Sequence, residues 1–152
     1  MLRHAQSAGK QSGQRDYDRL LTPQGEAEAR ACGKIFSEAN YFPDLILCSA
    51  ASRTRQTLEL FYELNRFPTD KIQFREDIYE AAMTDLLDVI NHLPDHINKV
   101  LLVGHNPGLS LLAGDLSSNF IDLSTSHLVG YESRSETWKE LGGSCKQIFN
   151  SK

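Results

Sequence analysis

Two histidines about a hundred residues apart are the residues of this sequence whose chemistry is easiest to name. Arg3 and His4 stand together near the start of the chain, and His105 follows an apolar run that ends at Val103. A neutral imidazole can act as a nucleophile, and a guanidinium can hold an anion through two parallel hydrogen bonds. If the fold brings these segments together, they form a site in which a phosphoryl group is held and passed to a histidine.

His105 lies in a segment that suits an anion. Gly104 lets the backbone approach a ligand closely, while Asn106 can cap the next helix and Pro107 fits its first turn. The free N–H groups at a helix N-terminus favour anions. A histidine that only bonds a nearby carbonyl is the alternative interpretation, and this segment alone leaves both open.

A third segment, residues 49–57, carries two arginines at positions 53 and 55. Residues two apart cannot share one face of a helix, so we expect only one of them to enter the site. Arg53 is nearer to the start of the predicted helix and to the strand before it, and we expect it to be that residue. We expect Arg55 to be a solvated charge.

Glu80 is the carboxylate that could serve as a general acid. It follows the apolar pair Ile78-Tyr79, and an acid that protonates a departing atom needs a raised pKa. An exposed glutamate without a role is the alternative. The remaining histidines lie outside these segments, and we interpret them as structural or surface residues: His92, His96 and His127.

Apolar periodicity and turn residues define the elements that must position these side chains. Thr22 and Pro23 predict a helix start, and Ala27, Ala31, Ile35 and Ala39 recur at helical spacing after them. Residues 6–21 read as a loop. The predicted helices cover residues 23–39, 51–65, 85–93 and a segment after 107, and the predicted strands cover residues 45–48, 72–74, 100–103, 128–132 and 145–149.

The alternation of strands and helices predicts an α/β domain with a mostly parallel central sheet. The last two strands are expected to be antiparallel at an edge. Ligands of such sheets bind outside the carboxyl ends of the strands. Residues 49–53 and 104–106 both follow a predicted strand, so we expect them to meet at one edge of the sheet.

Composition limits the classes of function that fit. The 152 residues predict one domain over residues 1–152, and 16 basic against 20 acidic residues give a net charge of −4. That balance argues against broad nucleic-acid binding. Three widely spaced cysteines indicate neither a disulfide framework nor a zinc site, and we expect a reducing cytoplasm. The sequence contains no run long enough to span a membrane, so no membrane partner is expected.

Taken together, these segments resemble the histidine phosphatase superfamily, which has the phosphoglycerate-mutase-like fold. Within it the chain is most similar to the small SixA-type phosphohistidine phosphatases, whose D-x-x-R-P-L-T-x-x-G segment resembles residues 16–25. Leu20 and Ala50 stand where proline is usual. The matching motifs occur in the family's order: Leu2-Arg3-His4-Ala5, residues 49–57, Ile78-Tyr79-Glu80-Ala81 and Gly104-His105-Asn106.

The resemblance implies a three-layer α/β/α domain and a set of roles. His4 would be the nucleophile that forms a phosphohistidine intermediate, and its other ring nitrogen would donate to a backbone carbonyl. Arg3, Arg53 and His105 would bind the non-bridging oxygens. Glu80 would protonate an alkoxide leaving group. Asn106 and Arg19 would contact the substrate, and no metal or cofactor would be required.

The resemblance also implies a full central strand before Arg3, whereas only Met1 and Leu2 precede it. We therefore expect the first strand to be truncated and the start of the protein to lie upstream. Loss of roughly four buried strand residues would cost several kcal/mol of apolar burial. It would also weaken the anchoring of Arg3 and His4.

The expected substrate is a phosphohistidine on a protein. Only 26 residues separate Arg53 from Glu80, which leaves little chain for a lid, and an open site suits a phosphorylated protein side chain. A phosphotransfer domain of a histidine-kinase relay is a candidate by analogy. The alternatives are a small-molecule phosphomonoesterase, an inactive phosphoprotein-binding module, and a metal hydrolase using His4, His105 and Glu80, which the two arginines disfavour.

Overall fold

The computed structural model describes residues 1–65, 67–141 and 145–152. Four parallel strands form the central sheet in the order β1-β4-β2-β3. Two further strands, β5 and β6, pair antiparallel, as the sequence predicted for the late strands. The strands are β1 Leu2–Arg3, β2 Leu45–Ser49, β3 Ile72–Arg75, β4 Val100–Gly104, β5 Val129–Glu132 and β6 Lys146–Asn150.

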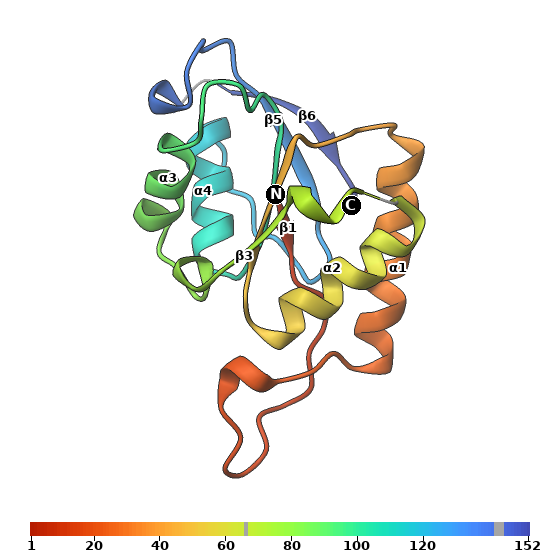
Figure 1. The fold of residues 1–152 in the computed structure, drawn as a ribbon. Coiled ribbons are helices and arrows are strands. Elements are labelled where there is room, and N and C mark those ends of the chain that lie inside the picture. The colour runs from red at the N-terminus through yellow and green to blue at the C-terminus, as the bar shows by residue number, and fades with distance from the viewer. Residues whose placement is uncertain (66, 142–144) are drawn as a thin grey trace.

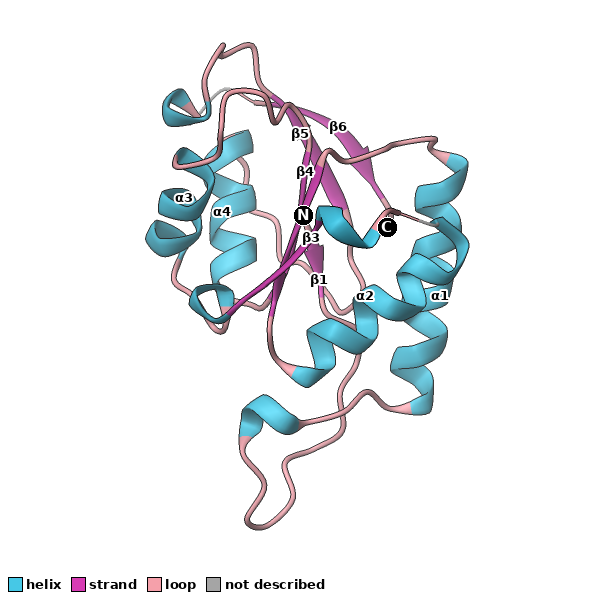
Figure 2. Cartoon of the chain, viewed as in Figure 1, coloured by secondary structure: helices cyan, strands magenta, loops and turns pink. Residues whose placement is uncertain are grey.

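Helices cover both faces of the sheet, so the three-layer α/β/α architecture is confirmed. Helices α1 and α2 lie on one face, and α3 and α4 lie on the other (Figures 1 and 2). The α-helices are α1 Pro23–Glu38, α2 Ser52–Asn65, α3 Met83–Asn91 and α4 Gly108–Ser117. The 3-10 turns are η1 Asp16–Asp18, η2 Thr69–Lys71, η3 Glu76–Ile78 and η4 Trp138–Glu140.

The two central strands explain why both faces need a helical layer. Successive side chains of a strand point to opposite faces, and a strand that is apolar throughout must be buried on both. In β2, Leu45 and Leu47 join the core that contains residues of α3 and α4, whereas Ile46 and Cys48 join the core that contains residues of α1 and α2. The alternation therefore fixes the sheet between the two helical layers.

Helix α1 begins as predicted but buries a different face. The Thr22 hydroxyl accepts a hydrogen bond from the Gly25 N–H at 3.0 Å, and Pro23 is the first helical residue. The predicted stripe is wrong, because Ala27, Ala31 and Ile35 are exposed. The buried stripe consists of Gly25, Ala29, Cys32, Gly33 and Phe36.

Strand β1 is only two residues long, yet its backbone pairs on both sides. Leu2 and Arg3 pair with Val103 and Gly104 of β4, and the Arg3 N–H donates to the His127 carbonyl at 3.1 Å. Leu2 has no exposed surface. These backbone bonds and the burial of Leu2 hold the short segment that carries Arg3 and His4 against β4.

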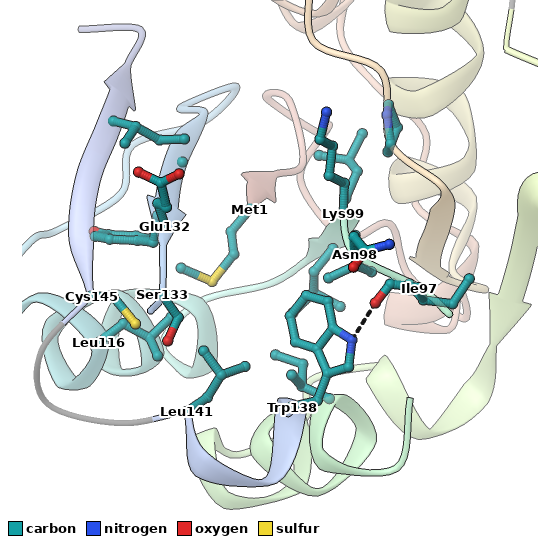
Figure 3. Close-up of a pocket in the computed structure, with 18 of the residues that line it drawn as sticks. Met1, Ile97, Asn98, Lys99, Leu116, Glu132, Ser133, Trp138, Leu141 and Cys145 are labelled. Atoms are coloured by element: carbon teal, nitrogen blue, oxygen red, sulfur yellow. Dashed lines mark hydrogen bonds between the residues drawn. The ribbon is translucent and has the colours of Figure 1, made fainter. Parts of the chain in front are cut away.

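A cavity of about 350 Å³ lies at the amino-terminal end of β4 (Figure 3). At this end of β4, Val100 and Leu101 pair with β2 on one side only. Strand β1 pairs with β4 on the other side, but only at Val103 and Gly104. The Trp138 indole N–H donates to the Ile97 carbonyl at 2.6 Å on its wall. None of the predicted site residues lines this cavity; those residues lie at the opposite, carboxyl ends of the strands.

Two further features of the described residues concern the cysteines and the length of the helices. The three cysteines, Cys32, Cys48 and Cys145, are buried and unpaired. Among the helices in the described part of the chain, none has both the length and the apolar character needed to cross a membrane.

Candidate active site

The predicted site residues converge at the carboxyl edge of the parallel sheet. His4 follows β1, His105 follows β4, and Arg53 lies in the first turn of α2 just after β2. The strand order places these three ends side by side. Glu80 follows η3 and approaches Arg53, with 3.5 Å between Oε1 and Nη2. The expectation that residues 49–53 and 104–106 meet at one edge is therefore confirmed.

Both nitrogens of the His4 ring have a partner, and these partners show which nitrogen carries the proton. Its Nδ1 lies 2.8 Å from the Ala5 carbonyl oxygen. A carbonyl can only accept, so Nδ1 carries the proton and Nε2 has the lone pair. This is the hydrogen bond that the resemblance implied. The remaining nitrogen, Nε2, accepts a hydrogen bond from Arg53 Nε at 3.3 Å.

Both histidines of the site are neutral near pH 7. Burial, assisted by the charges of Arg53, Arg3 and Arg19, lowers the pKa of His4 to about 4. Burial also lowers the pKa of His105 to about 3. The two rings lie with their centroids 5.1 Å apart. A neutral His4 keeps its lone pair and can therefore act as a nucleophile.

Arg53 connects His4 to the carboxylates of Asp16 and Glu80. Besides its contact with His4, its Nη1 donates to the Asp16 carbonyl at 2.8 Å, and Nη2 lies 2.8 Å from Asp16 Oδ2. Only 3% of its side chain is exposed. Arg55 lies outside the site, as expected, but it is held in place rather than solvated, because its guanidinium stacks 4.0 Å from the Phe74 ring centroid.

Polar residues of α2 tie the helix to the chain around His4. The Gln56 side-chain carbonyl accepts from the Leu21 N–H at 2.8 Å. The Thr57 hydroxyl accepts from the Ala5 N–H at 2.9 Å and donates to the Arg53 carbonyl at 2.6 Å. Thr57 therefore links the backbone of Ala5, the residue after His4, to the backbone of Arg53, which contacts His4.

Arg3 and Asn106 both reach one loop carbonyl. Arg3 Nη1 donates to the Leu123 carbonyl at 2.5 Å, and Asn106 Nδ2 donates to the same oxygen at 2.9 Å. The predicted capping of α4 by Asn106 is wrong, because Pro107 occupies the cap position and no side chain caps the helix. The Asn106 amide is instead committed to the loop that carries Leu123.

Buried polar atoms without a protein partner gather around this site. Within the described residues they include Arg3 Nε, His105 Nδ1 and Ser126 Oγ, and the Ser126 N–H donates to the His4 carbonyl at 3.2 Å. An unmade hydrogen bond at a buried polar atom is costly, and each such atom calls for an explanation. Donors from arginine, histidine and serine fit the oxygens of a bound anion.

Asp16 was not among the predicted site residues, yet two of those residues, Arg53 and Arg19, meet at its carboxylate together with Tyr79. Besides Arg53, it accepts from Arg19 Nη1 at 2.7 Å and from the Tyr79 hydroxyl at 3.0 Å. Partial burial opposes ionisation, but these hydrogen bonds and the charges of Arg53 and Arg19 hold the pKa of Asp16 well below its usual range. The spacing of Asp16 and Arg19 in residues 16–25 was the available signal.

The Arg19 guanidinium binds residues of the segment between β1 and α1. Its Nε donates to the Ala8 carbonyl and its Nη2 to the Ser7 hydroxyl, each at 2.7 Å. With the bond to Asp16, all three nitrogens have protein partners. Its charge still acts on the site, since it helps to lower the pKa of His4. The structure therefore places Arg19 as a support for Asp16 and for the loop.

Replacing Asp16 with asparagine is expected to lower kcat/KM for a reaction at this site by roughly 10-fold. The reason is that Asp16 positions Arg53, and a small misplacement of a group at the reacting centre is costly. Asp18→Asn is the matched control, since Asp18 lies in the same turn but pairs with the exposed Arg15. Steady-state kinetics on both variants would check this. An equal effect of the two changes would show that Asp16 does not position Arg53.

Glu80 lies at the open side of the site. Its side chain is 55% exposed, and its φ of +48° places the backbone in the left-handed region, a strained conformation that clusters at functional sites. Tyr79, the residue before it, packs edge-on against His105 with 5.4 Å between the ring centroids. Glu80 is therefore an exposed carboxylate that lies beside Arg53, the residue that contacts His4.

A metal site made of His4, His105 and Glu80 finds no support in the geometry. No group of three or more histidine, cysteine or acidic side chains in the described ranges is arranged to hold a metal ion. The Arg53 guanidinium lies 3.3 Å from His4 Nε2 and 3.5 Å from Glu80 Oε1. A cation placed between those two side chains would face the positive charge of Arg53.

Comparison with known families and proteins agrees with this geometry. The model of the histidine phosphatase superfamily (branch 1) matches residues 1–89. An uncharacterized chloroplastic protein of Arabidopsis thaliana is 33% identical over 92% of this chain and 68% of its own length. An uncharacterized protein of Mycobacterium tuberculosis is 36% identical over 77% of this chain and 70% of its own length.

Solved structures share the fold over almost the whole chain. A protein from Agrobacterium tumefaciens, assigned as the phosphohistidine phosphatase SixA, is 28% identical with a TM-score of 0.83 and covers 98% of this chain and 93% of its own. A protein from Escherichia coli, assigned as an alpha-ribazole-5'-P phosphatase, is 16% identical with a TM-score of 0.63 over 90% of each chain. The second likeness shows the fold alone.

Proposed function

Because the chain belongs to the histidine phosphatase superfamily, we propose that it hydrolyses phosphohistidine on a protein through a phosphorylated His4. The observation that carries this proposal is the state of the His4 ring. Its Nδ1–H donates to the Ala5 carbonyl, and its Nε2 lone pair accepts a hydrogen bond from the Arg53 guanidinium. That arrangement supplies a neutral nucleophile next to a group that binds phosphoryl oxygens.

In the first step, the His4 Nε2 lone pair attacks phosphorus and forms an N–P bond as the bond to the leaving group breaks. The departing imidazole of a phosphohistidine can leave already protonated, so it needs little help. Glu80 is placed to protonate an alkoxide if the substrate is a phosphoester. Arg3, Arg53 and His105 bind the three non-bridging oxygens and stabilise their charge, which is the main source of catalysis in phosphoryl transfer.

In the second step, water attacks phosphorus and the bond to His4 breaks. The electron pair of that bond returns to Nε2, and both protons of the water leave with the product as dihydrogen phosphate. Between the steps the ring is an imidazolium, because Nδ1 keeps its proton. The bond from Nδ1 to the Ala5 carbonyl stabilises that cation, so the same contact serves both steps.

Two observations favour a protein substrate. The segment between Arg53 and Glu80 forms α2, η2, β3 and η3 in its described residues, and the exposed Glu80 borders the site on the solvent side. The Agrobacterium tumefaciens protein, which is 28% identical, is assigned as a phosphohistidine phosphatase.

We further propose that the reaction needs no metal. We also propose that it takes place in the cytoplasm, where three unpaired cysteines are stable.

A substrate panel tests this function. It compares a phosphohistidine-carrying phosphotransfer domain with small phosphomonoesters, each with and without EDTA. We expect a higher kcat/KM for the phosphoprotein and no loss of rate in EDTA. A higher kcat/KM for a small phosphoester would indicate a small-molecule phosphatase of the same superfamily. A rate abolished by EDTA and restored by zinc would contradict the metal-free mechanism.

The low pKa of His4 predicts activity that persists in mildly acidic solution. His4 loses its lone pair only when it is protonated near pH 4, instead of near the usual 6.5. We therefore expect the acid limb of kcat/KM for a phosphomonoester to lie well below pH 6. The same shift in the pKa of His4 makes the stability of the fold depend on pH. Because His4 has a pKa of 6.5 when unfolded and about 4 when folded, the unfolded chain binds more protons between these pH values. The free energy of unfolding should therefore fall as the pH is lowered from 6.5 to 4. An acid limb at pH 6.5 would contradict this assignment.

A further inference from the structure

A buried serine lies against the second histidine of the site. Ser49 ends β2 and has no exposed surface, and His105 follows β4 and is 4% exposed. The two strands are neighbours, with Cys48 paired to Val103. Ser49 Oγ and His105 Nε2 are 2.8 Å apart. The end of one strand thus meets the histidine that follows the adjacent strand.

The position of the proton on His105 decides what this ring offers a ligand. The ring is neutral, so one of its nitrogens carries a proton and the other a lone pair. With Nε2 occupied by Ser49, Nδ1 is the nitrogen without a protein partner among the described residues. A phosphoryl oxygen accepts from an N–H group but is repelled by a lone pair, so only the tautomer with the proton on Nδ1 is useful.

The Ser49 hydroxyl can select that tautomer. It donates one hydrogen bond and accepts others, and the Ala51 N–H approaches its oxygen at 3.5 Å as a donor. This contact uses one lone pair of the Ser49 oxygen, and the hydroxyl proton is available to His105 Nε2. In the tautomer in which Nε2 accepts that proton, Nε2 holds the lone pair and Nδ1 carries the ring proton. The serine would thereby determine the state of a ring that belongs to the phosphate-binding set.

We propose that Ser49 is a positioning residue that holds His105 with its proton on Nδ1, so that the ring donates a hydrogen bond to the transferred phosphoryl group. This inference rests on the proposed function, because the phosphoryl group is its ligand. Ser49 touches neither the substrate nor His4 in this role. It acts through His105, and its effect must therefore be visible in the tautomer as well as in the rate.

The test measures the tautomer and the rate in the same proteins. Long-range ¹H–¹⁵N spectra of protein labelled with ¹⁵N-histidine report which ring nitrogen is protonated. We expect His105 to be protonated on Nδ1 in the wild-type protein and to shift toward Nε2 in Ser49→Ala. We expect kcat for a phosphohistidine protein to fall about 10- to 100-fold in that variant. This is less than the roughly 10²- to 10³-fold cost of removing a donor to a developing charge, because the ring stays and only its tautomer shifts.

Ser117→Ala is the control, because it removes a serine hydroxyl that donates to the Ala113 carbonyl in α4 at 2.7 Å. We expect it to leave both the tautomer and kcat unchanged. An active wild-type protein with His105 protonated on Nε2, or a Ser49→Ala variant with unchanged tautomer and rate, would overturn the positioning role alone. A wild-type protein that hydrolyses no phosphohistidine and no phosphoester would overturn the proposed function and with it this role.

Discussion

Replacing His4 with alanine is expected to lower phosphohistidine hydrolysis by roughly 10⁴-fold or more, the scale seen when the attacking group of an enzyme is removed. The side chain supplies the lone pair that attacks phosphorus, and no other neutral histidine nitrogen of the site is equally prepared. His105 is the neighbouring ring, but its Nε2 is bonded to Ser49. Hydrolysis of a ³²P-labelled phosphohistidine protein measures the effect.

His92→Ala is the matched control for this change, because His92 is an exposed histidine at the end of α3, and its side chain is 74% exposed. We expect that variant to keep the wild-type rate. Unfolding curves for both variants would establish that each is folded. A folded His4→Ala variant that still hydrolyses the substrate would remove His4 from the mechanism.

Replacing Arg53 with alanine is expected to lower kcat by about 10³-fold, because a buried arginine at a transferred phosphoryl group contributes on that scale. The change also leaves the Asp16 carboxylate without one of its partners. Arg53→Lys should recover little, since one ammonium cannot reproduce the contacts of a guanidinium with His4, Asp16 and Glu80 at once. Steady-state kinetics on the three proteins would measure the losses.

Arg55→Ala is the control for Arg53, because it removes an arginine from the same helix that stacks on Phe74 outside the site. We expect its kcat to stay within a few-fold of wild type, while its stability falls slightly. Equal losses of kcat in Arg53→Ala and Arg55→Ala would mean that the helix needs both arginines for folding, and the special role of Arg53 would be lost.

The sequence predicted the convergence of the site because that convergence follows from fold class. Strands that alternate with helices form a parallel sheet, and the carboxyl ends of its strands share one edge. His4, Arg53 and His105 each follow a strand that a short apolar run or a motif identified. Arg53 contacts His4 whereas Arg55 stacks on Phe74, because residues two apart cannot share one face of a helix.

The wrong predictions depend on contacts that are distant in the sequence. Helix α1 offers two stripes with the same helical spacing, and composition along the helix does not say which one meets α2. The structure selects the face with Gly33, where an added Cβ would lie 2.7 Å from the Phe61 carbonyl oxygen. A larger side chain there would separate the two helices.

Asp16 and Asn106 illustrate the same limit within the site. Asp16 lies in a polar loop, and only the fold brings it to Arg53, which is 37 residues further along the chain. Asn106 has the residue type of a helix cap, but the Leu123 carbonyl is close enough to accept its amide. Local preference identifies what a side chain can do, whereas the tertiary partners decide which of those interactions it makes.

The central claim is that phosphate passes through His4, and rapid-quench trapping of the enzyme during turnover tests it most directly. Because Nδ1 is bonded to the Ala5 carbonyl and Nε2 carries the lone pair, the account predicts acid-labile, base-stable phosphate on Nε2 of His4. Mass spectrometry locates the residue, and ³¹P spectroscopy identifies the nitrogen. Hydrolysis that proceeds with no phosphate on His4, or with phosphate on Nδ1, would contradict the account.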